Sequence, residues 1–249
     1  MRLISPAAGL LAVAVLPLAL TACSPTAPKA AAPAAAPAAD AQTPSAAVSA
    51  SPTEADANAG LLTGTQLKAA LAPASYFAAG FTADPADARD TGDTYELPAA
   101  ADVPTPDCTK LGGTSWTAVT GISGVSLAQN AYVNKNSSDE LAQEIDVYRG
   151  TTAETVLGAL GKLSKACPSF SDAQTSSKVT VTEKAVAGLG DGAWAITETS
   201  PAWKGGTTLV AARVGTSVVT VLASSSTDKG VAGATKLATR LVGALKGKG

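Results

Sequence analysis

Three cysteines and the absence of histidine limit the chemistry that this chain of 249 residues can perform. Without histidine there is no Ser-His-Asp or Cys-His arrangement for nucleophilic catalysis. A metal site is also disfavoured, because two thiols alone do not complete a tetrahedral set of ligands. Hydrolysis catalysed by two carboxylates is still compatible with the composition, but no stretch of sequence indicates such a pair. We therefore expect a protein that is not an enzyme and that needs no cofactor and no metal.

Two short motifs resemble phosphate-binding or catalytic sequences without their usual partners. GLGDG (188–192) lacks the G-x-G-x-x-G spacing and a following lysine, and it leads into a predicted strand. We expect Asp191-Gly192 to form a hairpin turn. Ser226-Thr227-Asp228-Lys229 matches the S-x-x-K of penicillin-binding enzymes, but S-D-N and K-T-G are absent. A helix cap is expected there instead.

Four aspartates recur at every third residue, at Asp84, Asp87, Asp90 and Asp93. Calcium loops of the EF-hand type need oxygen ligands at alternate positions, a central glycine and a late glutamate. The spacing does not supply them, so we expect a solvated acidic loop.

The first 22 residues are typical of a targeting segment that ends at a cysteine. Met1-Arg2 gives a positive start, and the apolar stretch 10–20 is too short to span a bilayer. Leu20-Thr21-Ala22-Cys23 resembles the lipobox of bacterial lipoproteins, in which the thiol is acylated and becomes the N-terminus. We therefore expect a lipoprotein signal peptide at 1–22, with lipidation of Cys23. The alternative is an ordinary signal peptide, which leaves Cys23 as an exposed thiol.

Residues 23–58 are dominated by alanine, proline, serine and threonine. Such a segment cannot bury enough apolar surface to offset the entropy of ordering, so it is predicted to be a disordered linker. Its extended character suits a spacer that lifts a domain away from a membrane.

The remaining residues, 59–249, are enough for one domain with its own core. The formal net charge of the chain is −2 and its 18 basic residues are scattered, which argues against nucleic acid as a partner. Cys108 and Cys167 form an even pair in this domain. In an exported protein, a disulfide between them is the simplest interpretation.

Hydrophobic periodicity predicts an α+β domain with an antiparallel sheet of about six strands flanked by helices. Helices are expected from a Thr65 cap up to Pro73, from Thr152 to Pro168, and over 231–246. Strands are expected at 125–133, 141–148, 178–184, 193–199, 207–214 and 217–223. In the second of these, Ile145 and Val147 are expected to face inward, and Glu144 and Asp146 outward. Residues 73–107 are predicted to be a long surface loop.

Three tryptophans stand out in a chain that is only 4% aromatic. Trp116 and Trp194 are predicted to anchor the core. Trp203 lies in a turn-like stretch between two predicted strands, with Ser200-Pro201 before it and Gly205-Gly206 after it. An aromatic side chain on a loop often marks a contact surface.

The order of five stretches resembles the PknH-like extracellular sensor domain found in actinobacterial lipoproteins. The stretches are TGTQLKAALAP, PDCTKL, VYRGTTAETVLGALGKLSKACPSF, AVAGLGDGAWAI and ATKLATRLVGALKG, and the resemblance covers about 60–249. It implies a twisted antiparallel sheet flanked by helices, with a cleft for an unidentified ligand. Members of this family carry two disulfides, whereas this chain offers only Cys108 and Cys167.

The resemblance implies a non-catalytic sensor or ligand-binding domain, lipid-anchored at the outer face of the cytoplasmic membrane. Its partners would be the membrane, through the anchor, and an extracellular ligand or envelope protein. Ligand contacts are predicted for Trp203 on its loop and for Tyr76 and Phe81 in the segment 76–97. The alternative is a structural or partner-protein adaptor of the envelope, without a small-molecule site.

Replacing Cys23 by alanine should release the protein from the membrane fraction without unfolding it, because a long linker separates the anchor from the domain. Fractionation followed by a salt wash measures the release. A Cys23→Ala variant that stays firmly membrane-bound would contradict the lipoprotein interpretation.

Overall fold

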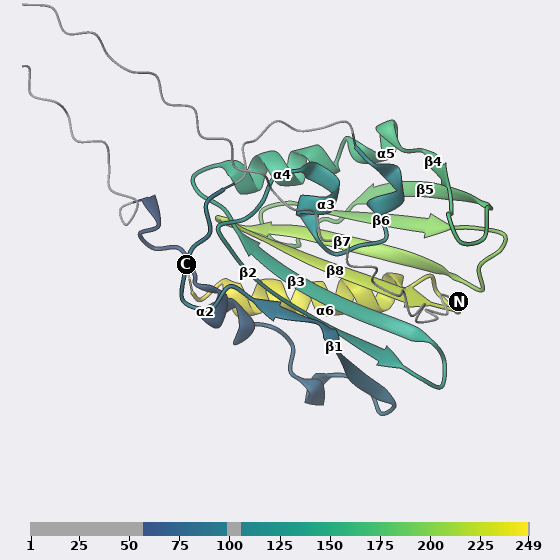
Figure 1. Cartoon of the computed structure of the whole chain (residues 1–249), viewed down its shortest axis with the longest axis horizontal. Helices are drawn as coiled ribbons and strands as arrows, with labels where there is room; N and C mark the ends of the chain where they lie inside the picture. Colours follow the sequence, from purple (N-terminus) through teal and green to yellow (C-terminus); the bar gives the residue numbers. More distant parts are fainter. Residues whose placement is uncertain (1–56, 99–105, 249) are drawn as a thin grey trace, which may run out of the picture. The chain divides into compact units, whose positions relative to one another are not determined.

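The computed structural model describes residues 57–98 and 106–248, so the predicted signal peptide, Cys23 and most of the predicted linker lie outside the described residues. The described part is built on one antiparallel sheet of eight strands in the order β1-β2-β3-β8-β7-β6-β5-β4 (Figure 1). Neighbouring strands are joined mainly by hairpins. The α+β class is confirmed, and the sheet has two more strands than the six expected.

The six expected strands are all present, each within about two residues of its predicted bounds. They are β2 (Ser126–Asn134), β3 (Asp139–Val147), β5 (Lys178–Ala185), β6 (Ala193–Thr199), β7 (Gly206–Val214) and β8 (Ser217–Ser225). The additional strands are β1 (Phe81–Asp90) and the short β4 (Ser169–Ser171), which form the two edges of the sheet.

The prediction of one long loop over 73–107 was wrong for β1. This strand pairs with β2 from Phe81 opposite Asn134, and its register shifts between Asp84 and Arg89 around Pro85. Proline and exposed charges are tolerated on an edge strand, since one side of its backbone needs no partner strand. The composition that indicated a loop therefore also fits an edge strand. Asp84, Asp87 and Asp90 lie on β1, and Asp90 forms a 3.0 Å salt bridge with Lys68.

Helices cover both faces of the sheet, and two separate apolar cores result. On one face, α2 (Gly64–Lys68) packs on β1 and β2, and α6 (Val231–Leu245) packs on β7 and β8. On the other face lie α3 (Trp116–Thr120), α4 (Thr152–Leu160) and α5 (Leu163–Ala166) (Figure 1). We call these the α6 face and the α4 face. The strands β3, β7 and β8 are consequently buried on both sides along most of their length.

Two helices differ locally from expectation. The first helix is capped by Thr63 rather than Thr65, through a capping box in which Thr63 and Gln66 bond each other's backbone N–H groups. The helix expected over 152–167 is divided into α4 and α5 next to Gly161. A Cβ at Gly161 would lie 2.7 Å from ring atoms of Trp194, so the glycine lets the indole pack closely. Trp194 is half-buried against the core of the α4 face, as predicted, whereas the side chain of Trp116 lies outside what the structure describes.

The last helix, α6, agrees with its prediction. Its buried stripe contains the expected residues Ala234, Leu237, Ala238, Leu241 and Leu245. No helix in the described ranges is long and apolar enough to cross a membrane.

The predicted disulfide is confirmed. It joins Cys108, in the short 3₁₀ helix η2 (Cys108–Lys110), to the buried Cys167 directly after α5. The two Cα atoms are 5.5 Å apart and 59 residues separate them in sequence. The bond ties the segment before α3 to the end of α5.

Reduction of this disulfide should lower the free energy of unfolding by about 4 kcal/mol, because a loop of this length then regains its entropy in the unfolded chain. Urea denaturation with and without reductant measures the change. Thiol labelling of the denatured, unreduced domain should detect neither Cys108 nor Cys167, and reaction of both would contradict the pairing.

Candidate functional site

The connection between α2 and β1 carries a group of aromatic side chains onto the α6 face. Gln143 of β3, which is fully buried, fixes this connection at Ala72. The Ala72 N–H donates to Gln143 Oε1 at 2.9 Å, and Gln143 Nε2 donates to the Ala72 carbonyl at 3.0 Å. Pro73 then opens the 3₁₀ helix η1 (Ala74–Tyr76). The turn that carries Tyr76 and Phe77 is thus held against the sheet.

Four aromatic rings form one cluster there, which we call the aromatic surface: Tyr76, Phe77, Phe81 and Tyr132. The Phe77 ring stacks on Tyr132 of β2 with a centroid separation of 3.8 Å. Tyr76 meets Phe77 edge-on at 5.4 Å, and Phe81 lies 6.2 Å from Phe77. Tyr76, Phe77 and Phe81 are half-buried, so each ring keeps part of its area accessible.

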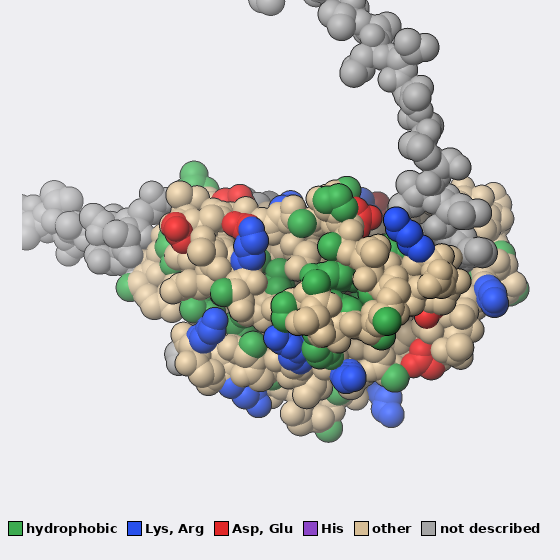
Figure 2. All heavy atoms as spheres, turned by 90° about the horizontal axis from the view of Figure 1, so that it is seen from below, with side chains coloured by type: hydrophobic (Ala, Val, Ile, Leu, Met, Phe, Trp, Pro, Cys, Tyr) green, Lys and Arg blue, Asp and Glu red, His purple; other side chains and the backbone are tan. Residues whose placement is uncertain are grey.

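Two cations of α6 flank the aromatic surface. Lys236 Nζ is 5.9 Å and the Arg240 guanidinium carbon 5.5 Å from the centre of the Tyr76 ring, within the range of cation–π attraction. Neither cation forms a salt bridge with another described residue. Burial raises the pKa of Tyr76, and the charge of Arg240 partly opposes this shift. Figure 2, which views the molecule from below, shows hydrophobic side chains near the middle of this face with Lys and Arg side chains around them.

A hollow of about 150 Å³ continues from Phe81 toward the start of α6. Leu141, Ala223 and Gly233 form its apolar part, and Asp139 and Asp228 lie on its rim. Asp228 caps α6 by accepting backbone N–H groups from Gly230 and Ala232 at 3.0 and 2.9 Å. These bonds, that of Ala232 above all, lower the pKa of Asp228. The S-x-x-K stretch is therefore a helix cap, as expected.

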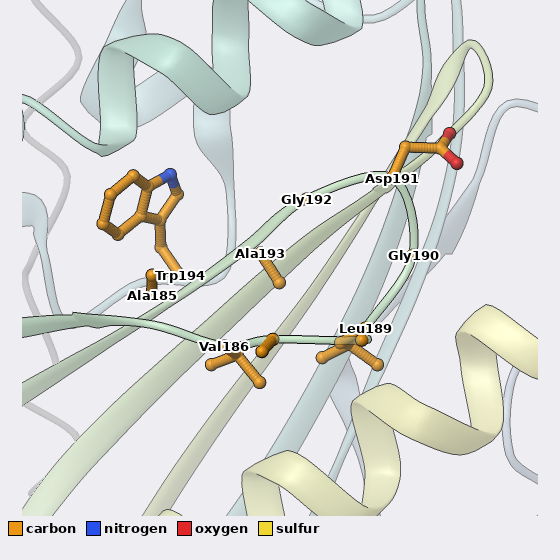
Figure 3. Close-up of a pocket in the computed structure, with 10 residues that line it drawn as sticks. Ala185, Val186, Leu189, Gly190, Asp191, Gly192, Ala193 and Trp194 are labelled. Carbon is orange, nitrogen blue, oxygen red and sulfur yellow. The ribbon is translucent and has the colours of Figure 1, made fainter.

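A second hollow, of about 420 Å³, follows the turn between β5 and β6 (Figure 3). Val186 and Leu189 point toward α6, while Trp194 points toward the α4 face. The GLGDG stretch forms this turn, as predicted. Gly190 has a φ of +60°, and a Cβ there would lie 2.2 Å from the Arg213 carbonyl. Asp191 accepts the backbone N–H of Gly215 at 2.7 Å, so its carboxylate joins two turns.

Trp203 lies apart from the aromatic surface, although Tyr76 and Phe81 are both within it. Trp203 sits in the β6–β7 loop, and its indole Nε1 donates to Asp172 Oδ2 at 3.0 Å. Asp172 is buried and its other oxygen accepts the backbone N–H groups of Gln174 and Thr175. The indole therefore fastens the β6–β7 loop to the turn between β4 and β5. Its predicted ligand contact stays a prediction.

A pair of buried carboxyl groups on β3 is the feature that the sequence interpretation missed. Glu144 and Asp146 were expected to face solvent, but they are 0% and 1% exposed. They lie on the α4 face, where Thr114 of the segment 106–123 donates a hydrogen bond to Glu144. An alternation of acidic and apolar residues usually indicates a strand with one face in solvent. It is compatible with burial of the acids only where a second layer covers that face, and the sequence does not show this layer.

The environment of the pair favours the protonated state. Burial raises the pKa of Glu144, while hydrogen bonds from Asp146 and Thr114 partly oppose this shift. Burial, together with the charge of Glu144, raises the pKa of Asp146 well above its usual range. Next to them, burial and the same two charges raise the pKa of Tyr148. Within the described ranges, no group of three His, Cys, Asp or Glu side chains could hold a metal ion.

Comparison with known proteins supports the fold. No family model and no curated protein matches the sequence. Among solved structures, the chain is similar to the crystal structure of the extracellular domain of PknH from Mycobacterium tuberculosis, with a TM-score of 0.52 and 13% sequence identity. The match covers 73% of this chain and 95% of that domain. At this identity the likeness shows the fold alone, and the predicted resemblance in fold is confirmed.

Replacing Trp203 by phenylalanine should destabilise the domain by about 1.5 kcal/mol, because the ring is kept but the buried Asp172 carboxylate loses a donor. Urea denaturation measures the change. Lys204→Ala, at the neighbouring exposed position, is the control and should stay within about 0.5 kcal/mol of the parent. Unchanged stability of Trp203→Phe would contradict this role of the indole.

Proposed function

We propose that this protein is a lipid-anchored binding protein at the outer face of the cytoplasmic membrane, and that its domain binds a ligand without catalysing a reaction. Two findings support the location. The fold is similar to that of an extracellular domain, and Cys23 follows the apolar segment of a predicted signal peptide. The anchor would hold the domain outside the membrane through the predicted linker.

The aromatic surface is the observation that carries the binding role. Tyr76, Phe77 and Phe81 each keep part of the ring accessible within one cluster, and a contiguous apolar patch on a surface often marks a binding site. Lys236 and Arg240 beside them have no carboxylate partner among the described residues. A ligand with a flat or apolar part next to a negative group would satisfy both features.

The shape of this surface favours one alternative, an adaptor that binds another envelope protein. The hollow beside Phe81 measures about 150 Å³, whereas pockets that enclose drug-sized ligands measure about 300–1,000 Å³. A shallow aromatic surface with flanking cations also suits an extended acidic segment of a protein. Enzymatic activity has less support, since neither hollow is lined by the buried carboxyl pair.

Native mass spectrometry of the full chain, extracted from its own cell envelope, tests the proposal. We expect a bound molecule on the parent protein and at least a tenfold lower occupancy on Lys236→Glu/Arg240→Glu, because reversing both charges repels a negative group. Lys246→Glu, which changes an exposed residue at the end of the same helix, is the matched control and should keep the parent occupancy.

The mass of the bound molecule separates the two candidates, since a small ligand adds less than a protein partner does. Equal occupancy on the double variant and the parent would show that the aromatic surface is not the binding site. An adduct that is lost from the control variant as well would point to a non-specific charge effect.

A further inference from the structure

The Glu144–Asp146 pair is not part of the aromatic surface, which lies on the opposite face of the sheet. Both side chains project from β3 into the core of the α4 face, between Ala142 and Tyr148. Buried acids are rare in proteins unless they are paired with a cation or take part in function. Two such acids at alternate positions of one strand therefore require a specific explanation.

Cations compensate this pair only weakly. Arg89 of β1 is the basic group whose charge acts on both carboxyls, and its side chain is exposed. Arg89 lies opposite Gln129, and Gln129 lies opposite Glu144, so Arg89 and Glu144 share one cross-strand row. Because neighbouring strands are about 4.8 Å apart, the two backbones are separated by roughly 10 Å. Arg89 forms no salt bridge with either carboxyl, and an exposed cation without direct contact does not offset the cost of burying two ionised carboxylates.

A shared proton is what remains to neutralise the pair. Burial raises the pKa of both carboxyls, and the charge of Glu144 raises that of Asp146 further, so the pair is expected to hold a proton. Glu144 Oε1, Asp146 Oδ2 and the hydroxyl oxygens of Tyr148 and Thr220 are buried without a hydrogen-bond partner among the described residues. If the proton leaves, two negative charges face each other in an apolar core, and water must enter or the cover must move.

The cover over the pair is the segment 106–123, which we call the cover segment. Thr114 Oγ1 donates to Glu144 Oε2 at 3.0 Å and so bonds the cover segment directly to the pair. Leu111, Val119 and Ile122 pack from it into the core of the α4 face. Its regular structure consists only of η2 and the five residues of α3, and its start is held by the disulfide at Cys108. The middle of the segment can therefore open while its start stays tethered.

The other charged groups near the cover segment do not neutralise the carboxyl pair. Asp107 and Lys110 of the cover segment are exposed and form a 3.8 Å salt bridge with each other. Glu154 of α4 is exposed. Opposite Glu144 on β8 lies Thr220, which carries no charge.

We propose that Glu144 and Asp146 form a proton-controlled latch: the shared proton keeps the cover segment closed over the sheet, and its loss to solvent opens the segment. The latch makes the α4 face responsive to the acidity outside the membrane. It does not depend on ligand binding at the aromatic surface.

The direction of the pH dependence follows from the raised pKa values of the two carboxyls in the folded state. A folded protein that holds a proton more tightly than the unfolded chain is stabilised at low pH. The pair's contribution is fully present below the ordinary pKa of carboxyl groups and is lost as the pH rises through their higher pKa values in the fold. The closed cover is thus expected in mild acid and the open cover in alkali.

Hydrogen exchange tests the latch on the full chain made soluble by Cys23→Ala. Between pH 5 and pH 8, protection of residues 111–123, corrected for the intrinsic exchange rate, should fall at least tenfold. Residues 207–223 of β7 and β8 serve as the internal reference and should keep their protection. In Glu144→Gln/Asp146→Asn the protection of 111–123 should not depend on pH, since neither side chain can then titrate.

Glu154→Gln is the matched control on the same face, and it should retain the parent's pH dependence. Because a core variant may misfold, carboxyl-carbon NMR titration of the parent provides a second measurement, in which two carboxyls should titrate above the usual range. Protection of 111–123 that is constant across the pH range overturns the latch. The same pH dependence in Glu144→Gln/Asp146→Asn, or the absence of elevated carboxyl titrations, overturns it as well.

Discussion

The covering of the sheet on both faces is the constraint on which the rest of the structure depends. With α6 on one side and α3, α4 and α5 on the other, the central strands β3, β7 and β8 have no face left for solvent. Alternation along such a strand no longer separates inside from outside. It decides only which of two cores each side chain enters, so every polar residue on these strands needs a partner inside the protein.

Neighbouring residues of β3 meet this requirement in different ways. Gln143 faces α6 and satisfies its amide with the backbone of Ala72 and the side chain of Asn130. This arrangement positions the turn that carries Tyr76 and Phe77, so a buried amide shapes the exposed surface. Glu144 faces the other way, where Thr114 donates a hydrogen bond to it and the buried Asp146 lies on the same face of the strand. One face of β3 thus fixes geometry, and the other holds a group whose charge state can change.

The two faces divide the functional features of the domain. The α6 face carries accessible aromatic rings with flanking cations, which suit recognition of another molecule. The α4 face carries the disulfide, the cover segment and the carboxyl pair. Trp203 joins the β6–β7 loop to Asp172 and lies away from the aromatic surface.

The sequence by itself determined the six main strands, the amphipathic α6, the cysteine pairing and the turn chemistry of GLGDG, because each depends on local periodicity or on a small set of residue types. It grouped Tyr76, Phe81 and Trp203 as ligand contacts, which stay a prediction; the structure brings Tyr76 and Phe81 into one aromatic cluster and places Trp203 apart from it. Only the tertiary structure decided that the acidic, proline-containing segment 81–90 is an edge strand, since its partner β2 is distant in sequence. It also decided that Glu144 and Asp146 are buried. Their surroundings depend on a cover that is held by a disulfide to residues far along the chain, and no local pattern reports such a long-range contact.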